Sequence, residues 1–151
     1  MRAALHPAAF VRARVPATRE RSWQYALAAV HAPFFTVRES DVLVVTLQEV
    51  EWMRVAPRFS SVAVERGLRL ISIDEAPPDP AFVNRLARVV AAAGVPASTF
   101  PTFYRDHLVV PAAHAQRGLD AVLQLGNETY DDYVRSSGGW MPRNIAHSAR
   151  S

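Results

Sequence analysis

The chain has 151 residues and half of them are hydrophobic, which is enough for one ordinary domain or for two very small ones that share a core. It contains no cysteine, so disulfides, thiolate metal sites and cysteine nucleophiles are excluded, and a reducing, cytoplasmic location is expected. All 17 basic residues are arginines scattered singly among acidic and apolar residues, so the net charge of +3 does not indicate a nucleic-acid partner.

We expect neither a membrane span nor an export signal in this chain. No apolar run approaches the roughly 20 residues that cross a bilayer, and the N-terminus lacks the apolar stretch of a signal peptide. We therefore expect a soluble, unprocessed protein with neither a membrane nor a nucleic acid as its partner.

The first half of the chain predicts a strand, a helix and a hairpin. Residues 8–15 alternate apolar and basic side chains, which is typical of a half-buried strand. A helix is expected between Thr18, a candidate N-cap, and Pro33. Residues 34–48 contain two β-rich runs around a turn-forming cluster, which predicts a hairpin. We expect residues 49–67 to be a connection with one short helical turn and a short strand.

The second half repeats this order. Residues 68–74 predict a strand, and a helix follows from Asp79, its candidate N-cap, to Gly94, its expected end. Residues 98–110 predict a second hairpin, and residues 113–125 predict a last helix that the following glycine would end.

The repeated order, βαββ and then βαββα, indicates a duplicated architecture. We expect an α+β fold of tandem ferredoxin-like βαββ units, with antiparallel sheets and helices on one face. The first unit is expected at residues 1–62, the second at residues 63–126, and a C-terminal tail at residues 127–151. Trp140, Met141 and Ile145 in this tail are apolar enough to dock on the domain or on a second subunit.

The stretch 98-STFPTFYRDHLVV-110 and its surroundings resemble the second half of an ACT domain, in particular of the paired, CASTOR-like ACT domains. The family pattern AGIS-x-F-x-x-STF-x-TDYLLV is matched at Ala93-Gly94-Val95, Thr102-Phe103, Asp106 and Leu108-Val109-Val110. The first half, AAFVRARVPA followed by a tryptophan and FFTVRESDVLVVTLQE, is similar to the opening strand, helix and hairpin of that family. The resemblance spans about residues 5–125 and implies tandem ACT-type units.

Such domains are usually small-molecule sensors, so the resemblance implies a regulatory protein that binds an amino acid or an amine-like ligand and uses no cofactor. It also implies a homo-oligomer, a two-fold dimer, because ACT sheets commonly pair side by side. The runs VLVV at 42–45 and HLVV at 107–110 are strongly β-forming and carry little charge, and we expect such strands at exposed edges to mediate this pairing.

The resemblance places the ligand site between the two units. The family binds its ligand with the loop after the first strand of the second unit, with one strand of the first unit, and with the strand that carries the STF-x-TD pattern. The candidate ligand-binding residues at these places are Asp74, Glu75, Asp79, Leu43, Thr46, Thr99, Thr102, Tyr104 and Asp106.

The chain departs from the family pattern at this site. Pro101 and Leu43 replace family serines, Arg105 replaces a threonine, and the family loop EGPLDF has become DEAPPDP at residues 74–80. Prolines remove backbone N–H donors, and extra carboxylates oppose an anion. We therefore expect the pocket to favour an amine, a guanidinium or a neutral polar group over a free carboxylate.

Two other functions stay open at this stage. One is a dimerising scaffold whose pocket is vestigial. The other is a small enzyme on the same fold, with acid–base chemistry from Asp74, Glu75, Tyr104, Asp106 or His107. No nucleophile elbow, phosphate loop or metal-like histidine spacing demands catalysis, so neither catalytic residues nor a metal are predicted.

Overall fold

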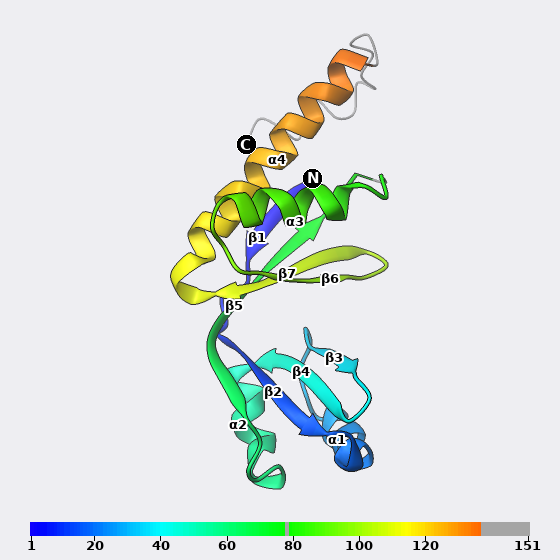
Figure 1. Cartoon of the computed structure of the whole chain (residues 1–151), viewed down its shortest axis with the longest axis vertical. Helices are drawn as coiled ribbons and strands as arrows, with labels where there is room; N and C mark the ends of the chain where they lie inside the picture. The colour runs from blue at the N-terminus through cyan, green and yellow to red at the C-terminus, as the bar shows by residue number, and fades with distance from the viewer. Residues whose placement is uncertain (78, 137–151) are drawn as a thin grey trace.

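The structure is a computed structural model that describes residues 1–77 and 79–136 (Figure 1). Its strands and helices are, in chain order, β1 (Arg2–Leu5), β2 (Phe10–Pro16), α1 (Glu20–Leu27), β3 (Phe35–Arg38), β4 (Val42–Gln48), α2 (Glu49–Val55), β5 (Val64–Asp74), α3 (Phe82–Ala92), β6 (Ser98–Pro101), β7 (Arg105–Pro111) and α4 (Ala115–Ser136). Short 3-10 turns at 17–19, 56–58 and 112–114 precede or follow the helices. No described helix combines the length and the apolar character needed to span a membrane.

The strands form one antiparallel sheet in which two units share a strand. The order is β3-β4-β2-β5-β7-β6, and β1 also pairs with β5. The first unit therefore runs β3-β4-β2-β5 and the second β6-β7-β5-β1, which is the same ferredoxin-like order twice. The N-terminal part of β5 closes the first unit, and its C-terminal part opens the second. The predicted fold class, tandem ferredoxin-like units of α+β type, is confirmed, while the exact unit boundaries stay a prediction.

A bulge in β5 keeps the helices of both units on the same face of the sheet. Phe10 of β2 pairs with Leu68, but Arg12 pairs with Glu65, so β5 holds one extra residue there. Gly67 within this step has a φ of 71°, the left-handed conformation that glycine adopts most easily. Because side chains alternate along a strand, one extra residue shifts the alternation. Val64 can therefore face the helices of the first unit while Ile71 faces those of the second.

Two separate cores lie under the helices, and a third cluster lies on the helix-free face. The core of the first unit is aromatic and includes Trp23, Trp52 and Phe59. The core of the second unit is mostly aliphatic, with Ile71, Ile73, Phe82, Leu86, Val90, Leu108 and Val110 among its members. The helix-free face buries Phe10, Leu68, Leu70 and Val109, with Phe35 and Phe100 packed against them.

Several predicted element boundaries were wrong. Strand β1 was not predicted, because four residues before a proline carry too little pattern to be recognised. The expected connection at 49–67 contains a full helix, α2, and the start of β5.

The last helix, α4, also differs from its predicted end, because it does not stop at Gly126 but continues to Ser136. Gly126 is a point of close approach: a Cβ there would lie 2.3 Å from the Cε of Met1. The predicted docking residues Trp140, Met141 and Ile145 lie outside the described residues.

Candidate ligand-binding site

An open cavity lies where β5 ends, between the following loop, the β6–β7 turn and the start of β1. Its volume is about 630 Å³, within the range of small-molecule sites, and its lining residues are Arg2, Asp74, Glu75, Thr102, Tyr104, Arg105 and His107. Four of the predicted site residues, Asp74, Glu75, Thr102 and Tyr104, are brought together here. The two arginines and the histidine were not predicted as ligand contacts.

The charges at this cavity form two ion pairs. Arg105 Nε lies 2.5 Å from Asp74 Oδ1, and Arg2 Nη2 lies 3.1 Å from Glu75 Oε1. Arg2 comes from β1, which only the tertiary fold brings beside β5. Glu75 has a φ of 55°, a left-handed conformation that is uncommon for a residue with a side chain and that often marks functional loops. The cavity therefore presents two cations and two anions.

The β6–β7 turn shapes one wall of the cavity. Thr102 closes the turn: its backbone N–H and its hydroxyl both donate to the carbonyl oxygen of Arg105, at 2.8 and 2.7 Å. The two residues between them, Phe103 and Tyr104, are 91% and 84% exposed, and their rings contact each other edge to face with centroids 4.8 Å apart. Two aromatic rings held in solvent beside a polar cavity offer apolar surface to a bound molecule.

His107 lies at the base of the cavity and is only 7% exposed. Its Nδ1 shares a hydrogen bond of 2.9 Å with Ser72 Oγ on the neighbouring strand β5. Burial, with Arg105 as a second cause, lowers the pKa of His107, although the carboxylates of Asp106 and Asp74 act against this shift. His107 is therefore a neutral polar group near pH 7 and adds no third cation to the cavity.

Three of the predicted residues in this unit point elsewhere. Asp79 accepts a hydrogen bond from the Ala81 N–H at 2.9 Å and pairs with Arg85 at 2.7 Å, and these two contacts lower its pKa. Thr99 and Asp106 pair with Leu108 and Ile73, so their side chains share the helix-covered face with the core. Partial burial there raises the pKa of Asp106.

The two predicted residues of the first unit do not reach the cavity either. Leu43 is 1% exposed within the core of the first unit, and Thr46 is 1% exposed on β4. Between the units, the ring of Phe35 stacks on Phe100 with centroids 4.6 Å apart and also contacts His107 at 5.2 Å. Aromatic side chains therefore occupy the space between the units in which the sequence had placed a ligand.

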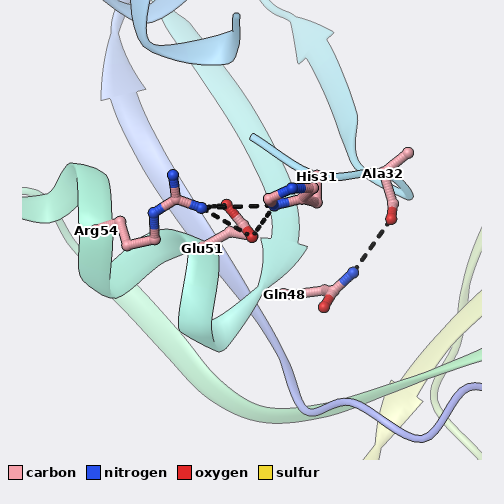
Figure 2. A network of polar contacts seen from close by, with 5 residues as sticks. All are labelled: His31, Ala32, Gln48, Glu51 and Arg54. Atoms are coloured by element: carbon pink, nitrogen blue, oxygen red, sulfur yellow. Dashed lines mark hydrogen bonds and ion pairs between the residues drawn. The ribbon is translucent and has the colours of Figure 1, made fainter. Parts of the chain in front are cut away.

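A second polar cluster lies in the first unit and has a different character (Figure 2). Glu51 is 4% exposed, and its carboxylate accepts hydrogen bonds from Arg54 Nη1 at 3.0 and 3.3 Å and contacts His31 Nδ1 at 2.7 Å. Nearby, Gln48 Nε2 donates to the carbonyl oxygen of Ala32 at 3.2 Å. The hydrogen bond from the His31 side chain is the main reason that the pKa of Glu51 is lowered, and it outweighs the opposing effect of burial. This cluster joins α2 to the segment after α1.

Within residues 1–77 and 79–136, no group of three or more histidine and acidic side chains is arranged to hold a metal ion. The charged residues at the cavity are instead suited to a polar organic molecule, because each charge has an opposite charge beside it.

Comparisons with known proteins define the fold further. No protein-family model matches the chain, and a search of curated proteins finds no match either. Among solved structures, the chain is similar to the aspartokinase alpha and beta subunits (10% identity, TM-score 0.68, 84% of this chain and 98% of that chain). It is also similar to the ligand-free regulatory subunit of aspartate kinase from Thermus thermophilus (15% identity, TM-score 0.65, 83% of this chain and 97% of that chain). A Vibrio cholerae protein of unknown function, a possible transport protein, is similar as well (22% identity, TM-score 0.59, 79% of this chain and 84% of that chain).

At these identities the likeness concerns the fold alone. The chain has the ACT-type fold of the regulatory part of aspartate kinase, over nearly the full length of the matched regulatory subunit. The resemblance to ACT domains is confirmed at this level, while membership of the paired, CASTOR-like kind stays a prediction.

Proposed function

We propose that this protein is a regulatory module that binds a small molecule, an amino acid or a related amine, at the cavity beside Asp74. The observation that carries the proposal is the pairing of Arg105 with Asp74 and of Arg2 with Glu75 around one open cavity. The shared fold with the regulatory subunit of aspartate kinase supports a regulatory role.

Balanced charges suit a zwitterion better than a simple cation. An ammonium group can replace an arginine beside Asp74 or Glu75, and a carboxylate can replace an acid beside Arg105 or Arg2. Both ion pairs are largely exposed, and such pairs contribute only about 0–1 kcal/mol, so a ligand can exchange them at little cost. The sequence-based preference for an amine over a free carboxylate rested on the prolines and acids of the loop, and it left out Arg2 and Arg105, which place cations beside these acids.

A thermal-shift screen over amino acids and related amines, followed by calorimetric titration, tests this proposal. A molecule that binds only the folded state raises the midpoint of unfolding by mass action. We expect one or a few amino acids or amines to do so, and Asp74→Asn to weaken their binding by about tenfold or more, because it removes a charged hydrogen-bond partner.

A matched control is available in the same loop. Asp79→Asn should leave the affinity unchanged, because the Asp79 side chain is turned towards Arg85 and Ala81. If no amino acid or amine stabilises the protein, or if both variants bind equally well, the proposed site is wrong and a scaffold role is favoured.

We also propose that the protein acts in the cytoplasm as a homodimer, but through other strands than the sequence suggested. VLVV and HLVV belong to β4 and β7, which have strands on both sides. The sheet instead exposes β3 at one end, where residues 36–38 are exposed, and exposed edge strands invite pairing. Sedimentation should give the mass of a dimer at micromolar to millimolar concentration, and a monomer throughout that range would contradict the proposal.

A further inference from the structure

A second cavity, far from the first, is surrounded by arginines. It has a volume of about 490 Å³ and is lined by Arg19, Arg21, Ser22, Tyr25 and Arg58. These residues come from the turn before α1, from α1 itself and from the 3-10 turn after α2. In Figure 1, α1 lies at the opposite end of the molecule from α4 and the chain's N-terminus.

The arginines at this cavity lack acidic partners. In the described part of the chain, no carboxylate lies within ion-pair distance of Arg19, Arg21 or Arg58, whereas Arg38 on the nearby strand β3 pairs with Glu20. The positive charge at the cavity is therefore not neutralised by the protein. Like charges held close together repel each other, and a bound anion would relieve this repulsion.

Two of the three guanidinium groups lie over aromatic rings. The guanidinium carbon of Arg19 lies 5.2 Å from the ring centre of Phe59, a residue that is 2% exposed, and Arg19 Nη2 donates to the carbonyl oxygen of Arg58 at 2.6 Å. The guanidinium of Arg58 lies 5.8 Å from the ring centre of Tyr25. Each guanidinium has five N–H donors, so most donors remain available to a ligand. Groups positioned in advance lose less entropy when a ligand binds.

We propose that this cavity binds a small molecule with a diphosphate group. Arginine forms bidentate, charge-assisted hydrogen bonds with phosphate oxygens, and three guanidinium groups match the charge of a diphosphate better than that of a single carboxylate. The hydroxyl group of Ser22 provides a further donor at the same cavity. Tyr25 is 77% exposed and offers an aromatic surface to any organic group attached to the phosphates.

Calorimetric titration of the full chain with inorganic pyrophosphate and with ADP tests the proposal, with sodium chloride matched for ionic strength as the blank. We expect saturable binding of at least one of the two probes at one site per chain. Affinity should fall as salt rises, because the charges are solvent-exposed. If phosphate contacts dominate, pyrophosphate should bind without an attached group. If contacts of the attached group with Tyr25 are needed, only ADP should bind.

The double variant Arg21→Ala/Arg58→Ala should weaken binding by about tenfold or more, because it removes charged hydrogen-bond donors. Arg88→Ala is the matched control, since Arg88 is an exposed helical arginine of the other unit, and it should bind as the wild type. Asp74→Asn should also bind pyrophosphate or ADP unchanged, which separates this site from the first cavity. If the double variant does not fold, Arg21→Ala alone serves, because the exposed Arg21 side chain forms no hydrogen bond or ion pair in the described residues.

Three results would overturn the proposal. The first is the absence of binding of both probes at about millimolar concentration. The second is an equal loss of binding in Arg88→Ala, which would indicate unspecific attraction to the positively charged protein. The third is binding of phosphatidylglycerol vesicles or of a single-stranded RNA oligonucleotide by a protein that binds neither probe.

Discussion

The two units share one topology but keep their polar groups in different places. In the first unit the carboxylate of Glu51, a residue of α2, is buried and is paired with His31 and Arg54. In the second unit Asp74 and Glu75 stand at an open cavity and form exposed ion pairs. The same strand order therefore supports a closed, structural cluster in one unit and an open, exchangeable one in the other.

The segments that follow the first strand of each unit also differ in length. In the first unit β2 runs directly into the turn at 17–19 and into α1, without an intervening loop. In the second unit residues 75–81 separate β5 from α3, and the cavity lies beside the start of this loop. Arg2, Asp74 and Arg105 at this cavity lie on β1, β5 and β7, and Glu75 lies in the loop, so strand ends and the longer loop form the site together.

The largest expected effect comes from the aromatic core of the first unit. Trp23→Ala should cost about 3–5 kcal/mol, because Trp23 is 1% exposed, packs against Phe59 and donates from Nε1 to Thr36 Oγ1 at 3.2 Å. Because both units share β5, we expect urea unfolding to remain a single transition, by fluorescence and by far-ultraviolet circular dichroism. Two separate transitions would show that the units unfold independently. Tyr25→Ala, at an exposed position of the same helix, should change stability by less than about 0.5 kcal/mol.

The next largest effect is expected at the bulge in β5, where the two units meet. Gly67→Ala should cost about 1–2 kcal/mol, since a Cβ there has open space around it and only the left-handed backbone conformation is penalised. Gly67→Asn should cost less, because asparagine adopts this conformation more readily than alanine. Urea titration of both variants measures the difference, and equal stability of the two would argue against the left-handed conformation at residue 67.

The buried carboxylate of the first unit should make a smaller, pH-dependent contribution. Glu51→Ala should cost about 1 kcal/mol at pH 7, a modest value because its partners His31 and Arg54 are themselves exposed. The folded-state pKa of Glu51 lies below its ordinary value of 4.5, so its stabilisation is complete above pH 4.5 and is lost as the pH falls through the folded-state pKa. The difference between wild type and variant should therefore shrink in acid.

Glu49→Ala on the same helix serves as the control for this measurement, because its ion pair with Arg66 is exposed. It should change stability by less than about 0.5 kcal/mol at pH 7. A Glu51 variant as stable as this control would show that the buried cluster contributes nothing.

The smallest stability effect is expected at the cavity of the second unit. Arg105→Ala should change the free energy of unfolding by less than about 0.5 kcal/mol, because its pair with Asp74 is exposed to solvent. The same variant should reduce the affinity for the amino acid or amine found in the ligand screen. A large loss of stability would show that the Arg105–Asp74 pair is a structural contact, as the Glu51 cluster is, and would contradict the contrast between the two units.

Much of the second unit was predictable because its local signals agree with its tertiary structure. The apolar residues Phe82, Leu86 and Val90 of α3 recur at helical spacing, and all three are 1% exposed. Gly94 has a φ of 74°, as expected of a residue that ends a helix. The candidate site was predicted less well: the loop acids Asp74 and Glu75 were found, but neither of their arginine partners was.

The sequence by itself determined most strands and helices, though not β1 or α2, and also that two units repeat and that the loop after residue 74 is polar, because these depend on periodicity and on neighbouring residues. Only the tertiary structure decided that β1 joins the second unit and brings Arg2 to Glu75, since this contact links residues at distant positions of the chain. The tertiary structure also decided that Asp106 faces the core while His107 faces the cavity, because the direction of a side chain depends on strand register. Local pattern carries no information on either point.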